Sequence, residues 1–251
     1  MASNIVFTHV PKTAGASIHH SVLVRFGVDN AIVVTGPDVV ERVRSEPPEN
    51  RRWIYVGGHI RFAEAAELFP SAFLVSSLRA PVERMLSHFF YVLRQDGAAT
   101  LPEEESVLAR FSAFYENLMR SRNDNLLCRY LSGQPSANAA IESVARNYTV
   151  VWNARQTRRA WPLVYAMCYR IANSGKPDVD LSSVPALSGE EHLHVAPVAQ
   201  TQHELATGAR PSSYLDFLPE PLLGRVLEEN AQDVRLMDWL DREHEGFFVN
   251  R

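Results

Sequence analysis

The sequence predicts an α/β fold in which helices cover both faces of a central, mainly parallel sheet. Three observations lead to this prediction. Short apolar runs rich in β-branched residues alternate with helix-like stretches along residues 4–95, as expected of βα units. Glycine and proline follow several of these runs, as at Gly36-Pro37 and Gly57-Gly58, where a strand would end. The chain has 251 residues, 46% of them hydrophobic, which is enough to bury a sizeable core.

Five runs are predicted to be strands, because each is short, apolar and rich in residues that favour β structure. They are NIVFTH (4–9), AIVVT (31–35), WIYVGGH (53–59), AFLVSSL (72–78) and YTVVWN (148–153). Since they alternate with helices, we expect them to lie parallel. Ligands of such sheets bind beyond the carboxyl ends of the strands, so the residues after each strand are the first candidates for a functional site.

Helices are predicted between these strands and through the second half of the chain. Their ranges are 17–26, 39–44, 63–69, 80–95, most of 103–147, 158–172 and 220–242. Pro81 suits the first turn of its helix, Gly133 is expected to end another, and 174–191 reads as a loop. The apolar stripe of the helix over 80–95 consists of Val82, Met85, Leu86, Phe89, Phe90 and Leu93. No boundary divides the chain, so we expect a single domain over 1–251.

Composition and charge argue against several classes of protein. Charged residues make up 22% and the formal net charge is -4, which is unlike a general nucleic-acid binder. The cysteines, Cys128 and Cys168, lack CxxC spacing, so we expect two buried thiols rather than a zinc site or a disulfide. No apolar run approaches the roughly 20 residues that cross a bilayer, and the N-terminus lacks a secretory signal. We therefore expect a cytoplasmic protein without a membrane span.

The loop HVPKTAGAS (9–17) joins the first strand to the first helix, and its residues favour binding of an anion. Backbone N–H groups and the positive end of the helix dipole converge in such a turn. Gly15 permits close approach of a ligand, Thr13 and Ser17 can donate hydroxyl hydrogen bonds, and Lys12 supplies a full positive charge. The alternative is a turn that only connects strand to helix, with a serine as its N-cap.

The same loop differs from the Walker loop of nucleoside triphosphatases. Lys12 precedes Gly15 by three positions, whereas the Walker lysine follows its glycine. The fourth strand ends in Ser77-Leu78-Arg79, without the aspartate that holds magnesium in those enzymes. A kinase or nucleoside triphosphatase with an unusual loop stays open as an alternative, as does a nucleotide-binding module without catalysis.

Three motifs resemble sulfotransferases that use 3′-phosphoadenosine 5′-phosphosulfate (PAPS), most of all the carbohydrate branch. HVPKTAGAS (9–17) resembles the loop that binds the 5′-phosphosulfate, and SLRAPVERMLSHFFY (77–91) resembles the motif that binds the 3′-phosphate. GGHIRF (57–62) resembles the segment that carries the catalytic base in uronyl and heparan sulfate 2-O-sulfotransferases. The resemblance covers roughly residues 4–95 and is faint in NDNLLCRYLSG (123–133). It implies a P-loop-like three-layer fold with a helical region on the substrate side.

The resemblance also implies roles for individual residues. The phosphosulfate would be held by Pro11, Lys12, Thr13, Ala14, Gly15, Ala16 and Ser17. Arg79 and Ser87 would bind the 3′-phosphate, and His59 would act as general base while Lys12 stabilises the leaving oxygen. Without the resemblance, Arg79 could equally form a salt bridge, and Ser87 would be a neutral serine on a helix surface. The expected acceptor is a hydroxyl of a sugar or glycoconjugate, with no metal and no nucleic acid.

Other histidines receive lesser roles. We expect His9 to orient the loop by hydrogen bonds, and His19 and His20 to lie on a helix surface. His88 is a weaker candidate for the base. The segment HLHVAP (192–197) places two histidines two positions apart with no third ligand, so we interpret it as strand or loop rather than a metal site.

The sequence departs from the family in three places. Ala16 stands where relatives often have threonine, and Ala80 follows Arg79 where aspartate is common. The stretch 187–202 has no lysine or arginine, although relatives often have a basic loop there over the nucleotide. Three arginines at 155, 158 and 159 follow the fifth strand, and we interpret them as an exposed, solvated run, with contact to an acidic substrate as the alternative.

Overall fold

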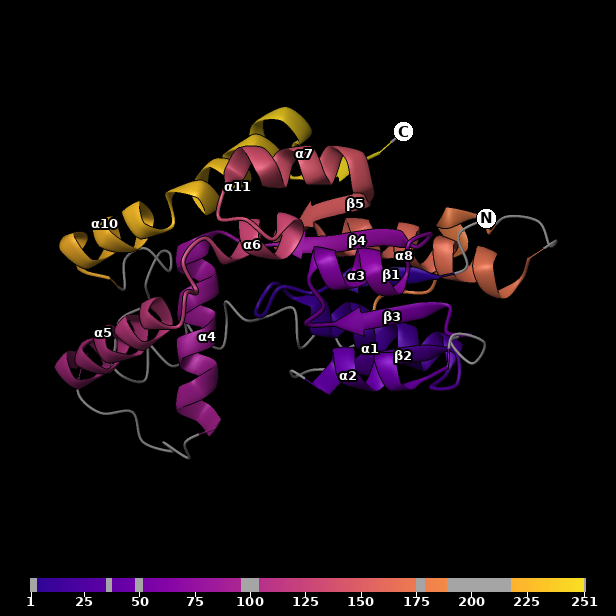
Figure 1. The fold of residues 1–251 in the computed structure, drawn as a ribbon, viewed down its shortest axis with the longest axis horizontal. Coiled ribbons are helices and arrows are strands. Elements are labelled where there is room, and N and C mark those ends of the chain that lie inside the picture. Colours follow the sequence, from indigo (N-terminus) through magenta and orange to yellow (C-terminus); the bar gives the residue numbers. More distant parts are fainter. Residues whose placement is uncertain are drawn as a thin grey trace.

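A computed structural model describes residues 4–34, 38–47, 52–95, 104–174, 179–188 and 218–250. One sheet of six strands crosses the molecule in the order β2-β3-β1-β4-β5-β6 (Figure 1). The strands are β1 (Ile5–Thr8), β2 (Ala31–Val34), β3 (Tyr55–Gly58), β4 (Phe73–Leu78), β5 (Tyr148–Asn153) and β6 (Phe247–Val249). The first five pair in parallel, and β6 runs antiparallel to β5. The predicted α/β class and the five predicted strands are confirmed.

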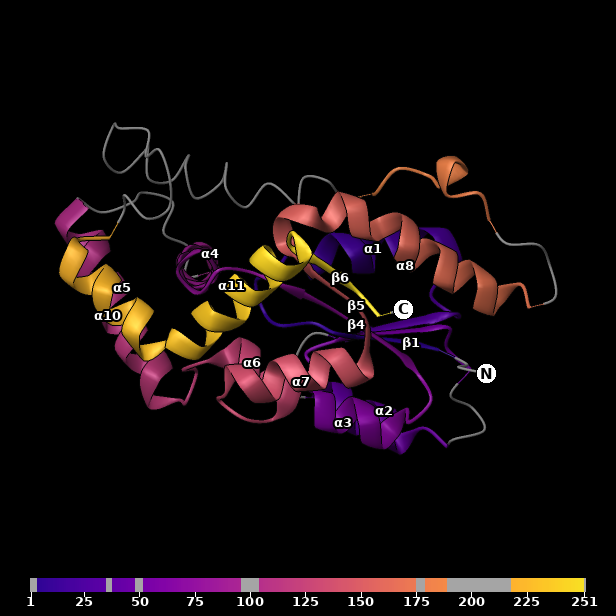
Figure 2. The same ribbon diagram turned by 90° about the horizontal axis from the view of Figure 1, so that it is seen from above.

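Helices cover both faces of the sheet and form three layers. They are α1 (Gly15–Phe26), α2 (Asp38–Ser45), α3 (Phe62–Leu68), α4 (Pro81–Gln95), α5 (Glu104–Arg120), α6 (Leu126–Ser132), α7 (Ala137–Asn147), α8 (Thr157–Ala172), α10 (Glu220–Glu229) and α11 (Ala231–His244). Helices α1 and α8 lie on one face, and α2, α3, α6 and α7 lie on the other (Figure 2). As predicted, α4 begins at Pro81, and Gly133 ends α6 with a φ of 79°.

The two faces of the sheet bury separate apolar clusters. Val6 and Val56 point to the side of α3 and α6, whereas Phe7 and Tyr55 point to the side of α1 and α8. This alternation follows from the two-residue period of a strand. All four residues of β1 are buried, as expected of a central parallel strand covered on both sides.

A third apolar cluster lies beyond the carboxyl edge of the sheet, where α4 packs against α5 and α10. Figure 1 shows α4 running across this edge, with α5 and α10 farther out. The six residues of the predicted apolar stripe of α4 are all buried in this cluster. Helix α4 therefore forms a wall that faces the strand ends.

The register of the sheet brings the carboxyl ends of the five parallel strands to this edge. Thr8 of β1 pairs with Gly58 of β3, and Leu78 of β4 pairs with Asn153 of β5. The residues that follow them, among them His9, His59 and Arg79, therefore emerge side by side. Carboxyl ends of neighbouring parallel strands are where α/β proteins bind ligands.

The prediction for the end of the chain was wrong in its boundaries. The predicted single helix over 220–242 is two helices, α10 and α11, which meet at Asn230, and β6 was not predicted. The Asn230 side chain donates to Val226 O (2.9 Å) and accepts from Asn125 N (3.1 Å). Hydrogen bonds between distant segments of the chain do not affect helical periodicity, and a three-residue strand is too short to predict.

Both cysteines are buried and free, as predicted. Among the described residues, each helix is too short or too polar to cross a bilayer.

Candidate functional site

The loop between β1 and α1 has a backbone that suits an anion. Lys12 and Ala14 adopt left-handed φ values of 71° and 65°, and Thr13 between them does not. Alternation of this kind turns successive N–H groups toward one concavity. The N-terminus of α1 has no side-chain cap and no acidic residue in its first turn, so its positive dipole end is not neutralised there. Left-handed conformations at two residues with side chains are unusual and cluster at functional sites.

Thr13 ties this loop to the end of β4. Its hydroxyl donates to Val10 O at 2.8 Å and lies 2.8 Å from the hydroxyl of Ser77, which therefore donates to Thr13. Thr13 and Ser77 are both fully buried. Because Ser77 lies two positions before Arg79, this contact brings the loop next to the strand end that carries Arg79.

Lys12 reaches from the loop to α4. Its Nζ lies 4.1 Å from the ring centroid of Tyr91, within range of a cation–π interaction. Ser87 lies one helical turn before Tyr91, on the same face of α4. The hydroxyl of Ser87 is buried and has no hydrogen-bond partner among the described residues. An unsatisfied buried hydroxyl costs roughly 1–3 kcal/mol, which an acceptor atom of a ligand would offset.

The remaining predicted residues of the loop differ in exposure. Gly15 and Ser17 are buried in the first turn of α1, Pro11, Lys12 and Ala14 are half-buried, and Ala16 is exposed. A Cβ atom at Gly15 would lie 2.4 Å from Cδ2 of His9, so only glycine leaves room for that ring. His9 thus packs beneath the loop against Gly15, and its expected role of orienting the loop by hydrogen bonds stays a prediction.

His19 corrects an expectation, because it is buried and not on a helix surface. Its exposed fraction is 4%, whereas His20 is exposed as predicted. Nδ1 of His19 lies 2.7 Å from the hydroxyl of Tyr55, and Nε2 lies 3.0 Å from Nδ1 of His9. The helix turns this imidazole toward β3, where Gly57 leaves space for it. Tyr55, His19 and His9 thus form a hydrogen-bonded chain that ends under the loop.

Burial keeps His19 and His9, the two histidines of this hydrogen-bonded chain, neutral. Desolvation, with a smaller contribution from the neighbouring His59, lowers the pKa of His19 from its usual 6.5 to about 3. Desolvation also holds the pKa of His9 well below its usual value, with smaller contributions from His19, His59 and Lys12.

Acid should therefore destabilise the fold through His19. Between the usual pKa of 6.5 and the native value of about 3, the unfolded chain binds a proton that the native state does not. The free energy of unfolding should thus be independent of this group above about pH 6.5 and fall below it by about 1.4 kcal/mol per pH unit. Urea unfolding between about pH 5 and pH 7 measures the slope. His19→Gln should reduce the slope, and His20→Gln on the exposed face of α1 should not. Equal slopes in wild type and His19→Gln would contradict this assignment.

His59 follows β3 and lines a pocket of about 400 Å³. The pocket is lined by Val40, Glu41, Arg44, His59, Arg61, Glu64 and Tyr130. Partial burial lowers the pKa of His59, so its imidazole is neutral near physiological pH and able to accept a proton. Its ring centroid lies 5.5 Å from that of His9, which brings His59 next to the support of the loop.

His88, the weaker candidate for the base, lies on the face of α4 that turns toward the loop. Desolvation, with smaller contributions from Arg84, Lys12 and His59, lowers its pKa to about 4. Its ring also packs edge-on against Phe114, at 5.2 Å between centroids. The depressed pKa makes His88 a weak proton acceptor compared with an ordinary imidazole.

Arg79 forms an ion pair with Glu83, one turn along α4, with 3.3 Å between Nε and Oε2. The other carboxylate oxygen of Glu83 pairs with Arg155, which follows β5. The side chains of Arg79 and Glu83 are largely buried, and that of Arg155 is mostly exposed. Glu83 thus links the predicted phosphate ligand Arg79 to Arg155, one of the three arginines that we expected to be exposed.

Arg84 is a further buried charge that the sequence analysis missed. Only 1% of it is exposed, and its Nε and Nη2 atoms have no hydrogen-bond partner in the described part of the chain. Asp233 offsets part of the desolvation of this guanidinium and accepts hydrogen bonds from Leu127 N and Cys128 N at the start of α6. In the sequence, the one signal that points to Arg84 is its position three residues before Ser87, on the same face of α4.

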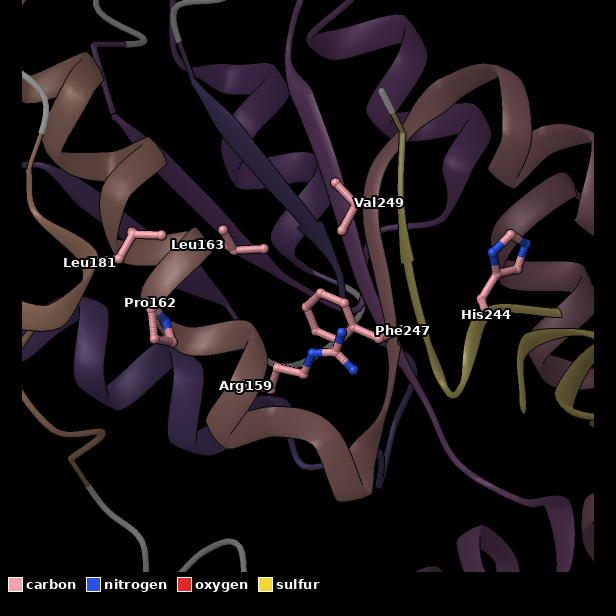
Figure 3. A pocket seen from close by; sticks show the side chains of 7 residues that line it. All are labelled: Arg159, Pro162, Leu163, Leu181, His244, Phe247 and Val249. Carbon is pink, nitrogen blue, oxygen red and sulfur yellow. The ribbon is translucent and has the colours of Figure 1, made fainter. Parts of the chain in front are cut away.

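A second pocket, of about 660 Å³, lies along the edge strand β6 and contains none of the predicted site residues. It is lined by Arg159, Pro162, Leu163, Leu181, His244, Phe247 and Val249. Figure 3 shows the guanidinium of Arg159 lying across the ring of Phe247, 4.6 Å from its centroid, with His244 on the other side of β6. Arg159 therefore belongs to this pocket, whereas Arg155 pairs with Glu83.

Within the described ranges, no three His, Cys, Asp or Glu side chains gather as a metal site would require. The segment HLHVAP (192–197) and most of 187–202 lie outside the described residues. No known family model matches the chain, and no curated protein matches it.

Proposed function

We propose that this protein transfers the sulfuryl group of PAPS to a hydroxyl group of a sugar or glycoconjugate, on a P-loop-like fold. The observation that carries the proposal is the hydrogen bond between Thr13 and Ser77. It joins a loop suited to one anion to the strand end that bears Arg79, a residue suited to a second. PAPS has two separate anionic groups, a 5′-phosphosulfate and a 3′-phosphate, so it requires two neighbouring anion-binding sites.

The residues of both anion-binding sites are suited to the phosphosulfate and the 3′-phosphate. The loop offers converging N–H groups, the start of α1 and the ammonium of Lys12 to the phosphosulfate. Arg79 offers a planar fork of donors to the 3′-phosphate, and Ser87 offers a hydroxyl without a partner among the described residues. Lys12 contacts Tyr91 on the same helix face as Ser87, so one nucleotide between loop and helix would meet both sets.

In the transfer, the acceptor oxygen bonds to sulfur while the bond from sulfur to the bridging phosphate oxygen breaks, and that oxygen keeps the electron pair. His59 accepts the proton of the acceptor hydroxyl, as a neutral imidazole can. Lys12 and the N-terminus of α1 stabilise the negative charge that develops at the phosphate. The chain Tyr55–His19–His9 fixes the loop beneath these groups.

The pocket beside His59 supports a sugar as acceptor. Tyr130 supplies an aromatic wall, and Arg61 lies over its ring at 5.6 Å. Glu41, Glu64 and the arginines supply donors and acceptors that can bind several hydroxyl groups. An acceptor in this pocket would present its hydroxyl directly to His59.

The thermal shift produced by nucleotides tests the proposal. 3′-Phosphoadenosine 5′-phosphate (PAP), the product nucleotide, should raise the melting temperature far more than adenosine 5′-phosphate (AMP), because only PAP occupies both anion-binding sites. ATP with magnesium serves as the third ligand. Equal shifts with PAP and AMP would contradict the 3′-phosphate assignment, and a larger shift with magnesium and ATP would favour a kinase or nucleoside triphosphatase.

A further inference from the structure

Glu83 lies between two guanidinium groups that come from different strand ends. Its Oε2 is 3.3 Å from Nε of Arg79, which follows β4, and its Oε1 accepts a hydrogen bond from Nη2 of Arg155, which follows β5. Asn153 at the end of β5 accepts a hydrogen bond from the backbone N–H of Arg155 at 3.1 Å, which fixes the turn. One carboxylate thus holds both arginines at the start of α4.

The net charge of Arg79, Glu83 and Arg155 together favours binding of an anion. Two guanidinium groups and one carboxylate sum to one positive charge, whereas Arg79 and Glu83 alone would sum to zero. Ser87 lies one turn beyond Glu83 on α4, and its buried hydroxyl has no partner in the described residues. A phosphate monoester carries about -1.5 to -2 charges at neutral pH and three acceptor oxygens. The pair of Arg79 and Glu83 by itself would therefore attract such a group only weakly.

We propose that Arg155 is a second guanidinium ligand of the 3′-phosphate and provides much of the selectivity for nucleotides with a 3′-phosphate. This inference rests on the proposed function, since it concerns the same nucleotide site. Glu83 has two roles here. It orients the fork of Arg79 from one side, and it holds the exposed side chain of Arg155 by an ion pair on the other. The planar fork of Arg155 can then donate to the phosphate oxygens together with Arg79.

The neighbouring arginine at the start of α8 behaves differently. Arg159 lies over Phe247 along β6, in a separate pocket (Figure 3). The three arginines at 155, 158 and 159 are all exposed, as expected, but Arg155 and Arg159 contact different parts of the molecule. The turn after β5 places Arg155 beside Glu83 of α4, and the first turn of α8 places Arg159 against Phe247 of β6.

Nucleotide affinities of Arg155→Gln test the inference. Isothermal titration should show that the variant binds PAP roughly tenfold more weakly or worse, because it loses charge-assisted hydrogen bonds. Binding of AMP, which lacks the 3′-phosphate, should change less than about twofold. Arg155→Lys, which keeps the charge but not the fork, should fall between wild type and Arg155→Gln.

Arg146→Gln is the matched control. Arg146 is exposed to the same extent as Arg155, with 74% of each side chain accessible, and it also pairs with a glutamate. This variant should bind PAP as wild type does. If Arg155→Gln keeps the wild-type preference for PAP over AMP, the inference is wrong while the proposed function stands. A wild-type protein without that preference would overturn both.

Discussion

Replacing His59 with alanine should lower the rate of sulfuryl transfer by roughly 100-fold to 10,000-fold, the usual contribution of a positioned general base. PAP affinity should stay close to wild type, because His59 belongs to the acceptor side of the site and not to the predicted phosphate ligands. His59 is half-buried, lines the pocket beside Tyr130 and remains neutral because burial lowers its pKa. Turnover with labelled PAPS and a sugar acceptor, together with PAP titration, measures both effects.

Two comparisons sharpen this experiment. His88→Ala removes the rival base, whose pKa of about 4 makes it a poor proton acceptor, and should cost much less activity than His59→Ala. His20→Ala changes an exposed imidazole on α1 and should leave turnover unchanged. If the proposed transfer takes place, its rate in the wild-type protein should fall on the acid side, at a pH below the usual 6.5 of histidine, because burial lowers the pKa of His59. If His88→Ala lost more activity than His59→Ala, the assignment of the base would be wrong.

The main features of the sheet and the candidate site were predictable because they depend on neighbouring residues. A β-branched run followed by a small-residue turn predicts both β1 and the loop that starts α1. In the same way, apolar runs that stop at Gly57-Gly58 and before Arg79 predict the ends of β3 and β4. Parallel strands then bring those turns to one edge, as the pairing of Thr8 with Gly58 shows. The stripe of α4 was equally predictable, since each of its residues enters one buried cluster.

The features that were missed depend on partners far along the chain. His19 was assigned to a helix surface because nothing in α1 reveals that β3 presents glycine opposite it. The exposure of Arg155 was expected, but its ion pair was missed because its partner, Glu83, lies 72 positions away in the sequence. The break at Asn230 depends on a hydrogen bond from Asn125, which helical periodicity does not detect. Each case is a polar contact between distant segments, and hydrophobic patterning carries no information about such contacts.

Gly57→Ala should destabilise the fold strongly, although it adds a single methyl group. Gly57 lies in β3, paired with both Phe7 of β1 and Val33 of β2, so its backbone cannot shift easily. A Cβ atom there would lie 2.5 Å from Cε1 and Nδ1 of His19, which would push the imidazole away from Tyr55. Overpacking costs about 1–3 kcal/mol and an unsatisfied buried hydroxyl about 1–3 kcal/mol more, so we expect a loss of roughly 3 kcal/mol.

A double-mutant cycle with His19→Ala identifies the cause of that loss. Without the imidazole, the ring of Tyr55, whose Cε1 would otherwise lie 2.7 Å from the new Cβ, can move into the vacated space and make room for the methyl group. Urea unfolding should therefore show that Gly57→Ala costs less than about 1 kcal/mol in the His19→Ala background. Gly224→Ala, on exposed α10 with no atom within 4 Å of the new Cβ, should be neutral or stabilising by up to about 1 kcal/mol. An equal cost of Gly57→Ala in both backgrounds would mean that His19 does not occupy the space above β3, and the support of the loop by the chain Tyr55–His19–His9 would then be wrong.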